Sequence, residues 1–132
     1  RAGLLCKEAG AKRVLPLPVS VPSHCELMRP AALKLAEKLQ SIEVKMPAIK
    51  VLQNVTASEP QSVEEIKENL IAQLYSPVLW TASMLSIVEQ GAQTAVECGP
   101  GKVLSGLNKK VHKPLVVAAL GDAAGWEKLL QA

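Results

Sequence analysis

The chain has 132 residues, of which 48% are hydrophobic and 20% charged, and its net charge is +3. This balance is typical of one globular domain or part of a larger one, and it excludes an intrinsically disordered chain. Nucleic-acid binding is disfavoured, because the charge is mild and only two Trp and one Tyr could stack on bases. An acidic protein partner or a phosphorylated small molecule suits the charge better.

The three cysteines, Cys6, Cys25 and Cys98, form neither an even set nor a C-x-x-C pair. We therefore expect a reducing compartment, the cytoplasm, and neither a disulfide framework nor a structural zinc site. Apolar runs fall short of the ~20 residues that cross a bilayer, so we expect no membrane span. The start lacks the apolar region of a signal peptide. Because residue 1 is Arg, we expect a processed or truncated chain.

The N-terminal part predicts a helix end followed by an extended segment. Residues 4–9 have a helical pattern, and Gly10 can close that helix in the left-handed conformation. Residues 13–23 contain prolines at positions 16, 18 and 22. Because proline donates no ladder hydrogen bond, this segment is expected to be an edge strand or irregular.

Two helices and a strand are predicted in the middle of the chain. A helix begins after His24, with Pro30 tolerated near its first turn. Residues 48–52 form a short apolar strand, and Ser62-Val-Glu-Glu65 has the spacing of a capping box. The two helices carry apolar residues at helical spacing: Leu27, Ala31, Leu35 and Leu39 on the first, and Val63, Ile66, Leu70 and Leu74 on the second.

The C-terminal part alternates helices and strands. A helix starts at Ser76-Pro77 and ends at Gly91. Then follow a strand over 94–97, a turn over 99–101, a helix from about 103, a strand over 115–120 and a short helix over 125–130. This alternation predicts an α/β fold with a largely parallel sheet covered by helices, although three or four strands are few for such a sheet.

The turn Gly99-Pro-Gly-Lys102 fits no phosphate-binding motif. A P-loop needs Gly where Val96 stands and Ser or Thr where Val103 stands, and the dinucleotide fingerprint needs Gly at Leu104. Ser105 is not in a G-x-S-x-G elbow, because positions 103 and 107 are Val and Leu. A tight strand-to-helix turn is the simplest interpretation, and no nucleophile is indicated.

His24 is the titratable residue of most interest. It follows the proline-rich segment, at the expected first turn of a helix, where the positive end of the dipole would keep the ring neutral as a general base requires. A histidine satisfied by its surroundings is the more common alternative. His112 stands among lysines and indicates a surface position. No His or Cys has the spacing of metal ligands, so no metal site is expected.

Three stretches together resemble one family. They are Val14-Leu-Pro-Leu-Pro-Val-Ser-Val-Pro-Ser-His-Cys25, Gln73-Leu-Tyr-Ser-Pro-Val-Leu-Trp80 and Glu97-Cys-Gly-Pro-Gly-Lys-Val-Leu-Ser-Gly106. Their order and spacing are similar to those of bacterial malonyl-CoA:acyl carrier protein transacylases. The resemblance runs through essentially the whole chain and corresponds to the C-terminal portion, less than half, of such an enzyme.

The resemblance implies a ping-pong malonyl transfer from CoA to the phosphopantetheine thiol of acyl carrier protein in fatty acid biosynthesis, with no cofactor. His24 matches the catalytic histidine that deprotonates the serine nucleophile. Gln73 matches the residue whose main-chain carbonyl accepts the other ring proton of that histidine. The residues that form a wall of the family's acyl pocket match Gly99, Gly101 and Val103. Basic positions that dock the acidic carrier correspond to Arg13, Lys109 and Lys110, which could equally be a solvated surface.

The family's serine elbow, oxyanion-hole glutamine and carboxylate-binding arginine are expected upstream of this chain. The resemblance implies that residues 1–19 are the end of a ferredoxin-like small subdomain. It also implies that residues 20–132 are the C-terminal part of a large hydrolase-like α/β subdomain. A base without a nucleophile performs no transfer, so we expect the 132 residues alone to be inactive. The alternatives are an acyltransferase domain of a polyketide or fatty-acid synthase and a non-catalytic carrier-binding fragment.

Overall fold

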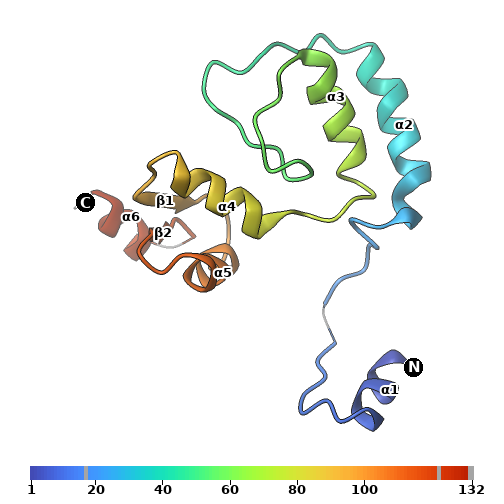
Figure 1. Ribbon diagram of the computed structural model, residues 1–132, viewed down its shortest axis with the longest axis vertical. Helices are drawn as coiled ribbons and strands as arrows, with labels where there is room; N and C mark the ends of the chain where they lie inside the picture. The colour runs from blue at the N-terminus through green and yellow to red at the C-terminus, as the bar shows by residue number, and fades with distance from the viewer. Residues whose placement is uncertain (17, 122, 131–132) are drawn as a thin grey trace.

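The computed structural model describes residues 1–132 except 17, 122 and 131–132, so Leu17 of the predicted extended segment lies outside the described residues. No described helix combines the length and hydropathy needed to span a membrane. The elements, in chain order, are α1 (Ala2–Glu8), the 3₁₀ turn η1 (Glu26–Met28), α2 (Arg29–Gln40), α3 (Val63–Ala72), α4 (Trp80–Glu89), β1 (Thr94–Glu97), α5 (Val103–Val111), β2 (Val116–Ala119) and α6 (Ala123–Leu130) (Figure 1).

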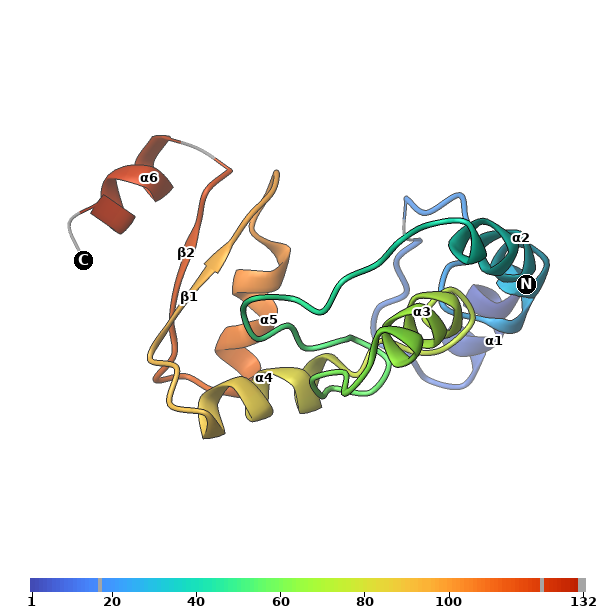
Figure 2. The ribbon, with the colours of Figure 1, turned by 90° about the horizontal axis from the view of Figure 1, so that it is seen from above.

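The sheet is a parallel pair of strands. β1 pairs with β2 in a register that runs from Thr94 opposite Val116 to Glu97 opposite Ala119. The connection between them is α5, as parallel strands require a crossover. Helices α5 and α6 flank the pair from opposite sides (Figure 2). The prediction of a parallel sheet covered by helices is therefore confirmed for this pair.

The strand predicted over residues 48–52 is wrong. The described residues there belong to no ladder, and the nearest pairing is an isolated antiparallel bridge between Gln53 and Ser58. A strand is stable only beside a neighbour that satisfies its backbone groups, and no described segment takes that place. The Lys50 ammonium instead donates to the side-chain oxygen of Gln90, at 3.0 Å, just beyond the end of α4.

Helices α2 and α3 lie side by side, at one end of the molecule, away from the strands (Figures 1 and 2). One of the two hydrogen bonds of the predicted capping box is confirmed at the start of α3. The Glu65 amide donates to the Ser62 hydroxyl at 3.0 Å. The Glu65 carboxylate accepts from the amide of Gln61, at 2.6 Å, rather than from that of Ser62. The first contact satisfies an amide that the first turn of a helix leaves unpaired, and the second ties the residue before the cap to that turn.

Several helix boundaries follow the predictions and one does not. Gly10 and Gly91 adopt φ of 90° and 94° just beyond α1 and α4, and Pro30 lies at the start of α2. However, α4 begins at Trp80 rather than at Ser76. The amide of Leu79 donates to the carbonyl of Asn54, at 2.8 Å, and this long-range bond holds the preceding residues outside the helix.

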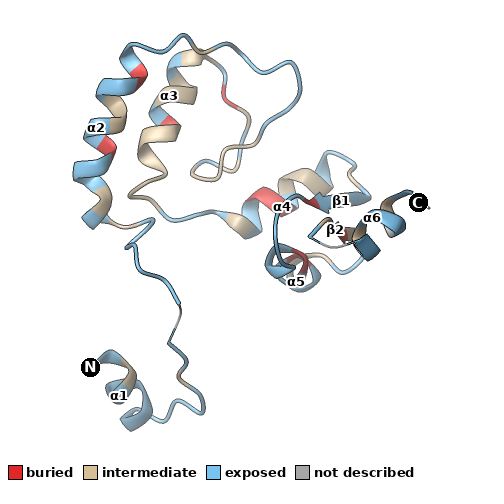
Figure 3. Ribbon diagram, turned by 180° about the vertical axis from the view of Figure 1, so that it is seen from behind, coloured by how far each residue is buried: buried red, intermediate tan, exposed pale blue. Residues whose placement is uncertain are grey.

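The buried core is small. Its hydrophobic members are Ala32, Leu39, Met84, Leu115, Ala118 and Ala119. Of the apolar residues at helical spacing after His24, Leu27 in η1 and Ala31 in α2 are exposed, while Ala32 is buried. Most of the ribbon is exposed (Figure 3).

The exposed area shows that this core is incomplete. The chain exposes 9892 Å², whereas a compact protein of its 14.0 kDa mass exposes about 6,700 Å². Apolar side chains such as Ile49, Val103 and Leu27 are among those left accessible to solvent. Surfaces of this kind are typical of regions that other protein covers.

Replacing Ser62 by Ala removes the hydroxyl that caps α3, and we expect the free energy of unfolding to fall by about 1 kcal/mol. Urea denaturation followed by far-ultraviolet circular dichroism measures the change. Ser20, which is exposed in the segment before η1, provides the matched control, and Ser20→Ala should change stability by less than about 0.5 kcal/mol. Equal effects of the two substitutions would contradict the capping role.

Candidate functional site

The backbone of His24 is held in an unusual conformation. Its φ is 62°, in the left-handed region that residues with a side chain rarely adopt. Its amide donates to the carbonyl of Leu74, at 3.0 Å. The left-handed conformation costs roughly 1–2 kcal/mol, which the hydrogen bonds of this residue offset. Such strain is typical of functional positions.

The imidazole ring of His24 is fixed by a second carbonyl. Its Nδ1 atom lies 2.7 Å from the main-chain oxygen of Gln73, the contact that the resemblance implied. A carbonyl oxygen carries no proton, so in this hydrogen bond Nδ1 must be the donor. In the neutral ring the other nitrogen, Nε2, is then unprotonated and free to accept a proton.

Both carbonyls belong to the C-terminal end of α3. Gln73 is the residue that ends this helix, and Leu74 follows it. The last carbonyls of a helix have no partner within it, so they are available to an external donor. His24 satisfies that of Gln73 at the cap, and also that of Leu74 in the turn that follows.

The prediction that His24 lies at the positive end of the helix that follows it is therefore wrong. His24 precedes Cys25, which caps the three-residue turn η1, and its ring contacts the negative end of α3 rather than the positive end of α2.

Side chains around η1 connect α2 to the segment that carries Gln73. The Arg29 guanidinium lies 4.2 Å from the centre of the Tyr75 ring and makes two hydrogen bonds to the Glu26 carboxylate, of 2.7 and 2.9 Å. The hydrogen bond from Arg29 lowers the pKa of Glu26. Sequence reasoning missed these residues, although the i, i+3 spacing of Glu26 and Arg29 was a signal. Both are exposed, so each pair adds little stability.

A cavity of about 240 Å³ lies beside the ring and is lined by Ser23, His24, Met28, Gln73 and Leu74. Within the described part of the chain, the Ser23 hydroxyl makes no hydrogen bond to the ring. The ring thus lies beside an open space, and among the described residues no hydroxyl is hydrogen-bonded to it.

The glycine turn follows β1, in the part of the chain that carries the two strands. Gly99 and Gly101 have φ of 145° and 91°, in the region that favours glycine, so the turn predicted there is confirmed. It does not contribute to the cavity beside His24. The structure therefore does not bring the predicted substrate-wall residues Gly99, Gly101 and Val103 against the histidine.

Glu97, the last residue of β1, connects this turn to α5. The side chain is buried, with 8% of the residue exposed, and its carboxylate accepts from the Leu104 amide at 3.0 Å. It also accepts from the amide and the hydroxyl of Ser105, at 2.8 and 2.6 Å. The hydrogen bond from the Ser105 hydroxyl, followed by that from its amide, lowers the pKa of Glu97. Sequence reasoning did not single out this residue.

The predicted carrier-docking residues are exposed but separated. Lys109 and Lys110 occupy the last turn of α5. Arg13 follows α1, which stands apart from α5 in both views (Figures 1 and 2).

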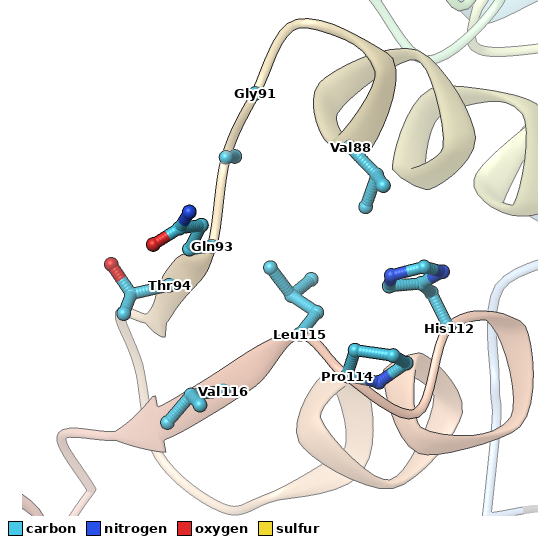
Figure 4. Close-up of a pocket in the computed structure, with 9 residues that line it drawn as sticks. Val88, Gly91, Gln93, Thr94, His112, Pro114, Leu115 and Val116 are labelled. Carbon is cyan, nitrogen blue, oxygen red and sulfur yellow. The ribbon is translucent and has the colours of Figure 1, made fainter.

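A larger cavity, of about 610 Å³, lies at the opposite end of the strands from the glycine turn. It is formed by the end of α4, the start of β1 and the segment before β2, and the His112 ring lines it together with Gln93 and Thr94 (Figure 4). Its lining residues offer no carboxylate, thiol or serine, so the arrangement lacks a partner for acid–base chemistry. Among the described residues, no group of three or more His, Cys, Asp or Glu side chains is placed to hold a metal ion.

Comparisons with known proteins relate the whole described chain to one kind of enzyme. It is 48% identical over 126 residues to the malonyl CoA-acyl carrier protein transacylase of Haemophilus influenzae, covering 96% of this chain and 40% of that protein. The Escherichia coli K12 transacylase is 47% identical over 131 residues, which cover 99% of this chain and 42% of that one. No family model matches the sequence.

Solved structures agree in fold. The malonyl-CoA:acyl carrier protein transacylase of Xanthomonas oryzae superposes with a TM-score of 0.91 at 41% identity, over 98% of this chain and 41% of that one. A malonyl-transacylase in complex with a type II polyketide acyl-carrier protein gives a TM-score of 0.88 at 50% identity, over 98% and 42%. The chain thus spans about two fifths of the length of the relatives it matches.

The lowered pKa of Glu97 predicts a defined acid dependence of stability. In the unfolded chain this carboxyl titrates at about pH 4.3. The stability that Glu97 contributes is present above that pH and is lost as the pH falls through the lower folded pKa. We expect the difference in unfolding free energy between the chain and its Glu97→Gln variant to shrink below about pH 4. Urea titrations across this range measure it, with the exposed Glu89→Gln as control. A constant difference would contradict the prediction.

Proposed function

We propose that this chain, which belongs to the malonyl CoA-acyl carrier protein transacylases and spans about two fifths of their length, supplies the general base of such an enzyme. The observation that carries the proposal is the hydrogen bond from Nδ1 of His24 to the Gln73 carbonyl. It orients the ring and leaves Nε2 as the proton acceptor.

In the first half-reaction, a serine hydroxyl from another part of the enzyme gives its proton to Nε2 of His24 as its oxygen attacks the thioester carbonyl of malonyl-CoA. The thioester C–S bond breaks, and the CoA sulfur leaves with the proton that the histidine then returns. In the second half-reaction, Nε2 takes the proton of the phosphopantetheine thiol, whose sulfur attacks the malonyl ester. The ester C–O bond then breaks, the serine oxygen takes the proton back from Nε2, and malonyl-carrier is released.

The two carbonyls at the end of α3 serve both half-reactions. Each time Nε2 accepts a proton the ring becomes positively charged, and the Gln73 oxygen, 2.7 Å from Nδ1 in the structure, is placed to accept from it. A hydrogen bond to a charged donor is roughly twice as strong as a neutral one. The contact therefore stabilises the charged form at the moment it develops, while the Leu74 carbonyl keeps the backbone in place.

The nucleophile, the oxyanion donors and the carboxylate-binding arginine are supplied by the remaining portion of the enzyme, and this chain alone is inactive. The large exposed area supports this proposal, because apolar surface is available for other protein to cover. Residues 1–19 then belong to a ferredoxin-like small subdomain, consistent with the isolated position of α1 in Figure 1. Residues 20–132 belong to a hydrolase-like large subdomain. We assign the enzyme to the cytoplasm.

The glycine turn, with Gly99, Gly101 and Val103, forms a wall of the acyl pocket once the enzyme is complete. Lys109 and Lys110 at the end of α5, together with Arg13, are proposed to attract the acidic acyl carrier protein. Exposed lysines suit this role because opposite charges accelerate encounter even when they add little affinity.

A second candidate function is malonyl loading of a polyketide carrier rather than a fatty-acid carrier. One similar structure, 50% identical, is a malonyl-transacylase in complex with a type II polyketide acyl-carrier protein. The chemistry at His24 is the same in both cases. Turnover of each carrier by the complete enzyme distinguishes them.

We expect His24→Ala, introduced into the complete enzyme, to reduce kcat/KM for malonyl transfer about a hundredfold or more, because the general base is lost. Stopped assays of malonyl-carrier formation measure the loss. The matched control is His112→Ala, which removes the histidine of the distant cavity and should retain activity.

A non-catalytic carrier-binding role predicts the opposite result, since His24→Ala would then leave turnover unchanged. The unmodified 132-residue chain, assayed alone, should show no turnover of malonyl-CoA. Activity of that chain would refute the proposal that the nucleophile lies in the remaining portion of the enzyme.

A further inference from the structure

The glycine turn is attached to the fold at its two flanks, through residues that make no contact with His24. On one flank, the Glu97 carboxylate bonds to Leu104 and Ser105 in the first turn of α5, across the turn from the end of β1. On the other flank, Gly121 follows β2 and lies directly against the turn.

Glu97 fixes the distance between the strand and the helix that the turn connects. Lys102, the residue that precedes α5, makes no side-chain cap to this helix. The cap comes from the Glu97 carboxylate, whose Oε1 accepts from Leu104 and whose Oε2 accepts from Ser105. A carboxylate can satisfy all of these donors at once, whereas an amide presents only one oxygen to them.

The burial of Glu97 makes these contacts important. A buried carboxylate is costly unless it is fully hydrogen-bonded, and this one is paired with the positive end of a helix. Its negative charge is thereby neutralised within the fold. This matters beneath a pocket wall that faces a malonyl group, because the substrate also carries a carboxylate.

Gly121 fixes the position of the turn from the side of β2. A Cβ atom at this position would lie 2.9 Å from the Gly101 nitrogen and 3.1 Å from the Gly99 oxygen. These neighbours are backbone atoms, so no side-chain rotation could relieve the contact. The ends of the strands are themselves joined, because the Leu120 amide donates to the Glu97 carbonyl at 3.0 Å.

We propose that Glu97 and Gly121 are positioning residues for substrate binding, which hold the turn Gly99–Gly101 where it meets the acyl group of malonyl-CoA. This inference rests on the proposed function, which makes the turn a wall of the acyl pocket. Displacement of the turn weakens binding of the acyl group, while the histidine and its carbonyl partners, whose cavity the turn does not line, are left as they are.

The experiment compares KM and kcat for malonyl-CoA in the complete enzyme. Glu97→Gln keeps the size of the side chain but leaves at least one of its donors unpaired, and we expect KM to rise about tenfold with kcat changed less than about threefold. Gly121→Ala should raise KM in the same direction. Ser105→Ala, which removes one bond and keeps both amide contacts, should have a smaller effect. The pH dependence of kcat should be the same in all of them.

Two substitutions are matched controls. Glu89→Gln changes an exposed carboxylate at the end of α4, and Gly106→Ala adds a methyl group where no atom lies within 4 Å. Both should leave KM unchanged.

Three results would overturn the inference. One is a wild-type KM in both Glu97→Gln and Gly121→Ala. Another is a loss of active enzyme on active-site titration with KM unchanged, since that indicates a structural role only. The third is an unmodified complete enzyme that transfers no malonyl group, which refutes the proposed function as well. In the first two results the proposed function stands.

Discussion

Two consecutive carbonyl groups at the end of α3 determine what His24 can do. One accepts from its ring and the other from its backbone amide, so the residue is held in a left-handed conformation with its Nε2 atom free. A conformation that costs roughly 1–2 kcal/mol is retained because hydrogen bonds at both groups offset it. The unpaired end of a helix, which many proteins satisfy with water, here holds the imidazole ring of His24.

A second helix end, the start of α5 beside the strands, is also satisfied by a residue from outside the helix. Glu97 satisfies the first amides of α5, and through them it fixes the glycine turn that follows β1. The two arrangements lie in separate parts of the chain, one formed by α2 and α3 and the other by β1, β2 and α5 (Figure 1). Each is held by several hydrogen bonds, while many apolar side chains around them are exposed. Local hydrogen bonding is thus satisfied at both helix ends although the buried apolar core is small.

The features predicted from sequence are those that neighbouring residues determine. The Ser62 cap, the left-handed Gly10 and the glycine turn each depend on a few adjacent residues. The strand at 48–52 failed because pairing depends on a distant neighbour, and the start of α4 was misplaced because a bond to Asn54 is long-range. The hydrogen bond between the Gln73 carbonyl and the His24 ring could be predicted only through resemblance. The amino-acid type at a position does not indicate what the main-chain oxygen of that residue contacts. The sequence places Glu97 in a strand and indicates no role of its own for that residue.

The tautomer of His24 is the most direct test of this account. Nitrogen-15 NMR of the complete enzyme, with its histidines labelled and His24 assigned by comparison with the His24→Ala variant, reports which ring nitrogen carries the proton. The account predicts that in the neutral ring Nδ1 is protonated and Nε2 is not. A neutral ring protonated at Nε2 would contradict it, because Nδ1 could then not donate to Gln73 and Nε2 could not accept a proton from a nucleophile.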